Sequence, residues 1–173
     1  MARNNPEDLH WYIGYVKSCT EFKAQEFMAR LGYESYVPVV EEVHRWSDRR
    51  KVVRRLVLPR IIFVHTTEYL RRRSLEENPY LTRYMAKDGP YTAAVVPDEQ
   101  MEAFRCMVDN DGRRVNVEPQ NFAPGDKVKV TSGPLRGMVC ELINVSGRRC
   151  LAVNLGALGT ATMDLELETI EKI

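Results

Sequence analysis

The chain has 173 residues, a mass of 20.0 kDa and a formal net charge of +1 at pH 7, which leaves room for one ordinary domain or two small ones. Apolar residues make up 44% and charged residues 28%, a composition that excludes a low-complexity or disordered chain. Aliphatic runs are far shorter than the roughly 18 residues of a membrane span, and residues 1–8 contain no apolar signal region. We therefore expect a cytoplasmic protein without a membrane partner.

The first half of the chain alternates strand-like and helix-like patterns. Runs of aromatic and β-branched residues predict strands at residues 11–16, 33–40, 56–65 and 81–85. Apolar residues at helical spacing predict three helices, between Ser18 and Gly32, between Thr67 and Asn78, and after Asp98. Ser18 and Glu21 have the spacing of a capping box, with Thr20 as a competing N-cap. Pro38 indicates an edge or a bulge in the second strand.

Residues 44–55 carry no apolar stripe, so we expect a long loop or an extended hairpin there. Residues 91–96 are expected to be short and extended. Apart from the hairpin, the order is strand, helix, strand, strand, helix, strand, followed by a third helix. That order is typical of the split arrangement of a ferredoxin-like antiparallel sheet, so we predict an α+β fold for this part of the chain.

Residues 111–121 contain few apolar residues and predict a linker between domains. Beyond them, residues 126–130 alternate polar and apolar side chains, and strand-like runs follow at residues 139–145, 151–155 and 160–167 with Gly-containing turns between them. About 50 residues of closely spaced strands predict a small closed all-β barrel, which leaves no long free edge.

Charge is segregated along this nearly neutral chain. Residues 45–73 hold ten basic residues against Asp48 and Glu68, a net charge of +8. A charge run is usually a solvated surface, but a basic face also concentrates polyanions through contacts with phosphates. The segment is therefore a candidate nucleic-acid-binding surface.

The sequence lacks the usual motifs of catalysis: a Gly-rich phosphate loop followed by Lys and Ser or Thr, His-Glu-x-x-His, and Gly-x-Ser-x-Gly. Its four cysteines form no Cys-x-x-Cys pair, and its three histidines form no ligand cluster. We therefore expect a protein that is not an enzyme, binds no metal and needs no cofactor, and whose cysteines are reduced thiols.

The most specific motif of the chain lies at residues 124–137, Pro-Gly-Asp-Lys-Val-Lys-Val-Thr-Ser-Gly-Pro-Leu-Arg-Gly. Its glycines allow turns with positive φ, and its alternate valines point to one side of a strand. The segment resembles the KOW motif, with matching residues at Gly125, Val128, Val130, Gly133, Pro134 and Gly137. Together with Trp11-Tyr12-Ile13 and residues 58–64, it makes the chain similar to the NusG family over nearly its whole length.

The resemblance implies an amino-terminal NusG domain at residues 8–110, a linker at residues 111–121 and an SH3-like KOW barrel at residues 122–173. It also implies that the first domain binds the clamp helices of RNA polymerase and favours processive elongation. The apolar contact strand of the family corresponds to Leu58, Ile61 and Phe63. Because side chains alternate along a strand, Ile61 and Phe63 share a face, and we expect that face to be exposed.

One loop of the predicted barrel departs from the family pattern. Ala157, Leu158 and Gly159, followed by Thr160, stand where general NusG proteins have Ile-Phe-Gly-Arg. In the family that loop contacts the termination factor Rho and a small-subunit ribosomal protein. Because binding energy concentrates in large anchor residues, we expect weak or no binding to Rho. The ribosomal protein remains a partner that the resemblance implies.

This departure favours a specialised NusG paralogue, similar to RfaH and to the antiterminators of capsular-polysaccharide operons. The resemblance to RfaH implies that Lys17, Thr20 and Arg30 contact the exposed non-template DNA strand. We expect phosphate contacts from the basic segment as well, at Arg49, Arg50, Lys51, Arg54 and Arg55.

The sequence therefore predicts a transcription elongation and antitermination factor that acts on a specific operon. Two alternatives stay open: the general NusG factor, which links polymerase to Rho and to the ribosome, and a ribosome-associated KOW protein that binds RNA. The amino-terminal half argues against the second, because such a protein needs only the barrel and a basic surface.

Overall fold

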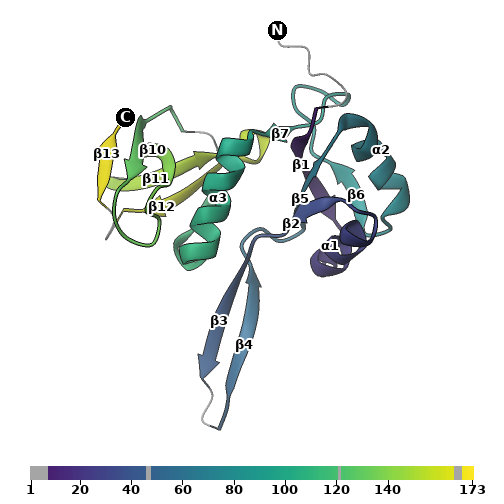
Figure 1. Ribbon diagram of the computed structural model, residues 1–173, viewed down its shortest axis with the longest axis horizontal. Helices are drawn as coiled ribbons and strands as arrows, with labels where there is room; N and C mark the ends of the chain where they lie inside the picture. Colours follow the sequence, from purple (N-terminus) through teal and green to yellow (C-terminus); the bar gives the residue numbers. More distant parts are fainter. Residues whose placement is uncertain (1–7, 46–47, 121, 166–168) are drawn as a thin grey trace. The chain divides into compact units, whose positions relative to one another are not determined.

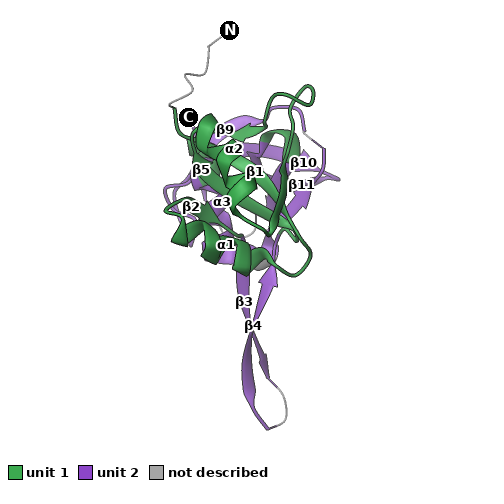
Figure 2. Cartoon of the chain, turned by 90° about the vertical axis from the view of Figure 1, so that its right-hand side faces the viewer, with its two compact units in different colours: residues 1–37, 58–101, 156–158 green, residues 38–57, 102–155, 159–173 purple. Residues whose placement is uncertain are grey.

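The structure is a computed structural model that describes residues 8–45, 48–120, 122–165 and 169–173 (Figure 1). The chain forms two compact units, which are described separately (Figure 2). The first unit contains the described residues up to 37, residues 58–101 and residues 156–158. The second contains residues 38–57, 102–155 and 159–173. Each unit is therefore built from segments that are distant in the sequence.

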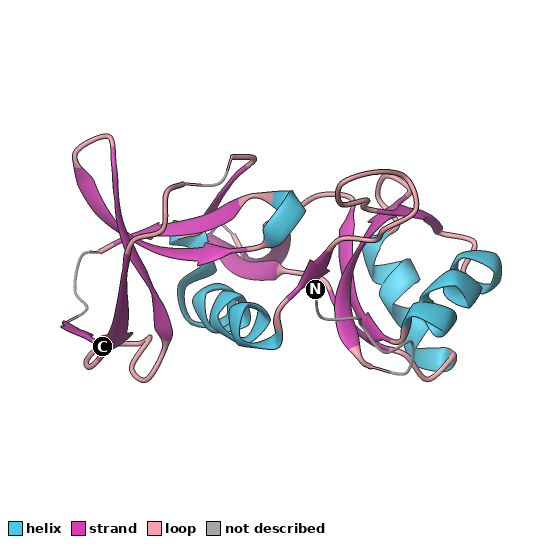
Figure 3. Ribbon diagram, turned by 90° about the horizontal axis from the view of Figure 1, so that it is seen from above, coloured by secondary structure: helices cyan, strands magenta, loops and turns pink. Residues whose placement is uncertain are grey.

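The first unit is an antiparallel sheet with two helices on one face. Its described strands are β1 (His10–Val16), β2 (Glu34–Tyr36), β5 (Ile61–Thr66), β6 (Leu81–Tyr84) and β7 (Val95–Val96). Their order is β2-β5-β1-β6, and β7 pairs with β1. Helices α1 (Glu21–Arg30) and α2 (Glu68–Glu77) cover one face of this sheet (Figure 3). The strand order is that of the predicted ferredoxin-like arrangement.

The two central strands of this sheet, β1 and β5, carry its core. Ile13, Ile62 and Phe63 are all 0% exposed. Gly14 follows Ile13 on β1 and lies opposite Ile62 of β5. A Cβ atom on Gly14 would come within 2.8 Å of the Leu81 Cδ1 atom. Any larger residue at this position would therefore require the Leu81 side chain to shift.

Arg71 fixes α2 on the sheet. Its guanidinium carbon lies 5.5 Å from the ring centroid of Tyr12 and 5.2 Å from that of Tyr84. Two of its nitrogens donate to the Glu68 carboxylate, at 2.8 and 2.6 Å, and this hydrogen bonding lowers the pKa of Glu68. The charge of Arg71 is both paired and stacked, which allows this residue to be only 8% exposed.

Helix α1 begins without the predicted capping box at Ser18. Thr20 is the N-cap, yet its hydroxyl donates to the Lys17 carbonyl oxygen at 2.7 Å and makes no cap hydrogen bond. Glu21 is 3% exposed, and its carboxylate accepts a hydrogen bond from the Arg60 backbone N–H at 2.8 Å. Arg60 has a φ of 64°. The Glu21 carboxylate therefore stabilises the turn that precedes β5, instead of the helix start.

Two predicted strands are shorter in the structure. Pro38 has no N–H for a ladder, and the strand expected at residues 33–40 is broken there: β2 ends at Tyr36 and β3 begins at Val39. The strand expected at residues 56–65 contains the turn around Pro59, so β4 ends at Leu56 and β5 begins at Ile61. Leu58, which we expected on the strand, lies in that turn.

The second unit contains a long hairpin, a helix and a second sheet. Strands β3 (Val39–Arg45) and β4 (Arg50–Leu56) form the hairpin, as one of the two structures predicted for residues 44–55. Helix α3 (Asp98–Asp111) has most of its length in this unit. The second sheet contains the described strands β8 (Asn116–Glu118), β9 (Asp126–Val130), β10 (Val139–Val145), β11 (Arg148–Asn154), β12 (Thr160–Asp164) and β13 (Ile170–Lys172).

This second sheet is antiparallel, with the order β13-β9-β10-β11-β12-β8. Val130, Leu151, Val153 and Ala161 are 0% exposed and form part of its core. Strands β9 and β10 have the predicted bounds, whereas β11 begins at Arg148 instead of residue 151. The predicted strand at 160–167 ends at Asp164 in the structure, and residues 166–168 lie outside the described part of the chain.

Residues 111–121, for which we predicted a linker, contain regular structure. The 3-10 turn η1 (Gly112–Arg114) follows α3 directly, and β8 pairs with β12. Strand β8 has only three residues. An alternation of polar and apolar side chains cannot be recognised over so short a segment, so the sequence did not predict a strand there. The domain bounds 8–110 and 122–173 stay a prediction. No described helix has the length and apolar character of a membrane span.

Candidate nucleic-acid interface

The hairpin of β3 and β4 is a long two-stranded arm of the second unit (Figure 2). Directly opposite residues of an antiparallel pair share a face, and one face carries the pairs Glu41–Arg54, Val43–Val52 and Arg45–Arg50. Most of the side chains are exposed, including Val43 at 55% and Val52 at 58%. Opposed arginines next to the hairpin turn repel each other. An anion bound beside both guanidinium groups would offset this repulsion, so the pair favours an anionic ligand.

The predicted hairpin cations fall into two groups. Arg55 Nε donates to Glu42 Oε1 at 2.7 Å, and Arg54 Nε lies 3.4 Å from Glu41 Oε1. The hydrogen bond from Arg55 lowers the pKa of Glu42. Arg49, Arg50 and Lys51 are exposed and have no ion pair with another described residue. The cluster that the sequence predicted as one DNA-binding group is therefore a paired stem and an unpaired tip.

A small pocket of about 210 Å³ lies beside α1 in the first unit. Lys23, Glu26, Phe27 and Arg30 line it from one side of the helix, and Tyr80 lines it from the segment before β6. The rings of Phe27 and Tyr80 meet edge to face, with centroids 6.4 Å apart. The lining combines two aromatic rings with the cations Lys23 and Arg30 and the Glu26 carboxylate. Aromatic rings beside cations form a lining that suits a nucleobase.

The structure separates the three residues predicted to contact the non-template strand. Arg30 lines the pocket, and its Nη2 donates to Glu26 Oε1 at 2.6 Å, an exposed ion pair with 69% and 65% of the side chains accessible. Lys17 and Thr20 lie at the start of α1, about 15 Å from Arg30 along the helix axis. The Lys17 N–H donates to the Tyr80 carbonyl oxygen at 2.9 Å, which connects this end of the helix to the segment that supplies Tyr80.

Phe27 and Tyr80 are the pocket residues that sequence reasoning missed. Phe27 has the helical spacing of the apolar residues of α1, but Ala24 and Met28 are fully buried, whereas Phe27 is half-buried. The spacing of Lys23, Phe27 and Arg30 along one helix side was the available signal. Tyr80 is distant in the sequence, and no local pattern connects it to α1.

Ile61 and Phe63, predicted to present an exposed contact face to polymerase, are buried in the structure. Ile61 is 5% exposed and Phe63 is 0% exposed. Strand β5 runs between β1 and β2, and its residues from Ile61 to Val64 are buried on both faces. Leu58 is half-buried in the preceding turn. The expectation of exposure was therefore wrong, because alternation cannot distinguish the two faces of a central strand when both are covered.

The residues of the KOW-like motif lie where the second sheet requires them. A Cβ atom on Gly125 would be 2.1 Å from the Leu142 carbonyl oxygen. Val128 and Val130 are 2% and 0% exposed. Gly133 and Gly137 have φ values of 83° and 93°, and they flank the turn that contains Pro134.

The loop predicted to contact other factors lies between β11 and β12. Ala157 is exposed and Leu158 is half-buried, at the end of the 3-10 turn η2 (Gly156–Leu158). Gly159 has a φ of 112°. The loop thus offers one small exposed side chain where the family pattern has large apolar anchors.

No group of three or more His, Cys, Asp or Glu side chains within the described ranges could hold a metal ion. The four cysteines are free thiols, and Cys140 and Cys150 are buried. Burial raises the pKa of the Cys140 thiol to about 12 and that of the Cys150 thiol to about 11. Both groups are therefore protonated at neutral pH and poor nucleophiles.

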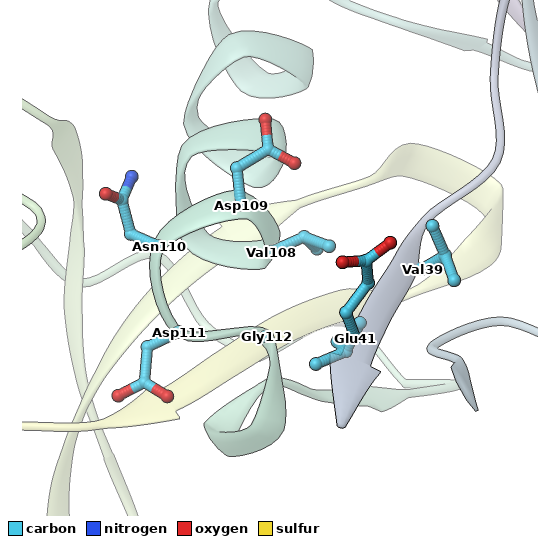
Figure 4. Close-up of a pocket in the computed structure, with 8 residues that line it drawn as sticks. Val39, Glu41, Val108, Asp109, Asn110, Asp111 and Gly112 are labelled. Carbon is cyan, nitrogen blue, oxygen red and sulfur yellow. The ribbon is translucent and has the colours of Figure 1, made fainter. Parts of the chain in front are cut away.

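A second pocket, of about 430 Å³, lies where the hairpin meets α3 (Figure 4). Val39, Val40 and Glu41 of β3 line one side, and the last turn of α3 with Gly112 lines the other. A Cβ atom on Gly112 would be 2.5 Å from the Val40 Cγ2 atom. Glycine at this position therefore allows the base of the hairpin to pack against the end of α3.

Comparisons with known proteins identify the family. The family model NusG, described as "Transcription termination factor nusG", matches residues 9–105, more than half of the chain. A search of curated proteins finds no match. Among solved structures, the chain is similar to "Domain interaction in Thermotoga maritima NusG", with 19% identity and a TM-score of 0.47 over 98% of this chain and 99% of that one. It is also similar to "Crystal Structure of MjSpt4:Spt5 complex conformation A", with 15% identity and a TM-score of 0.33 over 94% and 98% of the two chains. The match of the family model shows that the chain belongs to the NusG family of transcription factors.

Proposed function

We propose that the chain is a non-enzymatic transcription elongation factor that binds RNA polymerase and acts as an operon-specific antiterminator, similar to RfaH. The observation that carries this proposal is the aromatic and basic pocket beside α1, lined by Phe27, Arg30 and Tyr80 among others. A pocket of this chemistry in a NusG-family protein can select an unpaired base of the non-template strand.

The hairpin supports a second, unselective contact with nucleic acid. Arg49, Arg50 and Lys51 are exposed at its tip, and their charges are available to phosphates. Phosphate contacts contribute affinity and position the protein, whereas base contacts contribute specificity. We therefore assign general affinity to the hairpin tip and sequence preference to the α1 pocket.

Strand β5 is the proposed polymerase-binding element, through Leu58, Ile61 and Phe63 against the clamp helices. Ile61 and Phe63 are buried in the structure, so their engagement with polymerase requires a rearrangement that exposes β5. Family membership supports polymerase as the partner. Because these residues are buried, we propose that β5 becomes exposed in a step that precedes contact with polymerase.

Residues 122–173 are the proposed KOW barrel, supported by the glycine positions and by the two buried valines of the motif. Its loop at Ala157, Leu158 and Gly159 lacks the large apolar anchors of general NusG proteins, which supports weak or absent binding to Rho. A small-subunit ribosomal protein stays a proposed partner of this barrel. A measurement of Rho binding would therefore distinguish an operon-specific factor from a general NusG factor.

The experiment is run-off transcription through a terminator, on templates that differ only in the non-template bases of the transcription bubble. We expect readthrough to depend on those bases and to lose the dependence in Phe27→Ala and Arg30→Ala. Phe22→Ala is the matched control, because Phe22 is a partly exposed aromatic residue of the same helix outside the pocket. Readthrough that does not depend on the bubble sequence in the wild-type protein would contradict the operon-specific role.

A further inference from the structure

Strand β8 covers one edge of the second sheet with a short ladder. Asn116, Val117 and Glu118 pair with Thr162, Ala161 and Thr160 of β12. On its other edge, β12 pairs with β11 over the five positions from Thr160 to Asp164. The ladder between β8 and β12 is therefore the weaker of the two attachments of β12.

Two contacts hold β8 at its ends. Before the strand, the Arg114 guanidinium donates to the Asp164 carbonyl oxygen and, at 3.0 Å, to the Asp111 carboxylate. After the strand, the Glu118 carbonyl oxygen approaches Gly159 so closely that a Cβ atom there would lie 1.9 Å from it. Val115, between Arg114 and the strand, is also buried at 6% exposure. Among the described residues, the position of β8 therefore depends on Arg114, on this small apolar contact and on the close approach at Gly159.

The segment before β8 is attached to the hairpin as well. Gly112 lies against Val40 at the base of β3, where an added Cβ atom would be 2.5 Å from the Val40 Cγ2 atom. Residues 112–118 thus contact the hairpin at one end and the second sheet at the other. They connect the basic hairpin to the second sheet by contacts of their own.

We propose that residues 112–118 form a strap that detaches from β12 while the remaining sheet stays folded. A three-residue edge ladder with few contacts at its ends opens at lower free energy than the strands inside the sheet. With the strap attached, the hairpin base, α3 and the second sheet form one body. With the strap detached, this connection between the hairpin base and the second sheet is lost, and the β12 positions from Thr160 to Thr162 lose their ladder partner on that edge. This device goes beyond the proposed function and does not depend on it.

Amide hydrogen exchange of the full-length protein tests the strap. The N–H groups of a strand inside an antiparallel sheet alternate between its two neighbours, so the amides of β12 form one set that faces β8 and one set that faces β11. If the strap detaches separately, the set that faces β8 exchanges at least about tenfold faster. If both sets exchange at the same rate, the strap opens only with the whole sheet and the proposal fails.

Two glycine variants separate the strap from general strain. Gly159→Ala introduces a Cβ atom at the Glu118 carbonyl oxygen and also a strained positive φ, whereas Gly147→Ala introduces the strain alone, because nothing lies within 4 Å of its Cβ position. We expect Gly159→Ala to increase the exchange rate of the amides that face β8 by about a further tenfold. Gly147→Ala should leave the ratio of the exchange rates of the two sets unchanged. Equal responses of the two variants would overturn the proposal. If Gly159→Ala does not fold, Arg114→Met replaces it, because it removes the guanidinium donors but keeps an apolar side chain. The same increase in the exchange rate of the amides that face β8 is expected.

Discussion

Arg55 donates through its Nε atom to the Glu42 Oε1 atom at 2.7 Å, across the two strands of the hairpin. Glu41 and Arg54 form a second ion pair on the opposite face of the hairpin. The two pairs neutralise the stem of the hairpin and leave its positive charge at the tip, at Arg49, Arg50 and Lys51. Charge counted along the sequence could not show this division, because the partners come from the opposite strand.

The division predicts different salt dependences for tip and stem. Neutralising Arg49, Arg50 and Lys51 to Gln should reduce the slope of log K against log salt by about 0.9 for each lost phosphate contact. Neutralising Arg54 and Arg55 should reduce it less, because these charges already have partners. Equilibrium binding to duplex DNA over a salt series measures both. Glu42→Gln is the matched control: it releases Arg55 and should increase the slope, and a larger loss from the stem than from the tip would contradict the assignment.

The burial of Phe63 predicts that it is a stability residue as well as a proposed contact residue. Phe63→Ala should lower the free energy of unfolding by about 3–5 kcal/mol, and Phe63→Asp should prevent folding. Urea unfolding followed by tryptophan fluorescence measures the loss, with Tyr91→Ala as the control because Tyr91 is 91% exposed. A folded and stable Phe63→Asp variant would show that this side chain is accessible in solution.

A conservative change separates the two roles of Phe63. Phe63→Leu keeps an apolar side chain of similar volume, and the expected loss of stability is below about 1.5 kcal/mol. If β5 contacts polymerase, this variant should fold and yet bind elongation complexes more weakly than the wild-type protein. Unchanged affinity would remove Phe63 from the proposed interface.

The order of elements along the first unit could be predicted because each element depends on a local pattern, and the long hairpin was one of the two structures predicted for its segment. The runs at residues 11–16 and 81–85 became β1 and β6, and the charged segment became β3 and β4. The α1 pocket could be predicted only in part: Arg30 was assigned, but its aromatic neighbour Tyr80 is brought to α1 by the packing of the whole unit.

Other features could not be predicted because their cause is distant in the sequence. Strand β8 exists because β12 offers an edge to it, more than 40 residues further along the chain. Glu21 was assigned to a helix cap, and its true partner is the Arg60 N–H in the turn before β5. In both cases the local sequence is compatible with several structures, and a long-range hydrogen bond selects one of them.

The paired charges of α2 predict a pH dependence of stability. The pKa of Glu68 is lowered by its hydrogen bonds with Arg71, so its ionised form stabilises the folded state above the ordinary carboxylate pKa, and this contribution is lost as the pH falls through the lowered value. Glu68→Gln should therefore lower Tm at pH 7, and the difference from wild type should shrink as the solution is acidified below pH 4.5. Glu26→Gln, which breaks the exposed pair with Arg30, is the control and should change Tm little at any pH. A constant difference for Glu68→Gln across the pH range would contradict the linkage.

The loop at Ala157 and Leu158 predicts weak binding to Rho. Replacement of two large anchors by smaller residues should cost most of the interface energy, because such energy concentrates in few residues. The full-length protein should therefore bind Rho at least about tenfold more weakly than a general NusG factor in the same titration. Ala157→Ile combined with Leu158→Phe should restore part of the affinity. Equal affinities of the unmodified chain and the general factor would favour the general NusG role.

The most direct test of the central claim, that the α1 pocket reads the non-template strand on transcribing polymerase, is a competition measurement. Elongation complexes with a fixed non-template bubble sequence compete for the protein against complexes in which that sequence is randomised. We predict that the wild-type protein enriches a subset of the random bubbles and that Phe22→Ala enriches the same subset. Phe27→Ala should bind all bubbles equally and lose about 1–3 kcal/mol of binding free energy for each base that stacks on the ring. Enrichment of the same subset by Phe27→Ala would contradict the account.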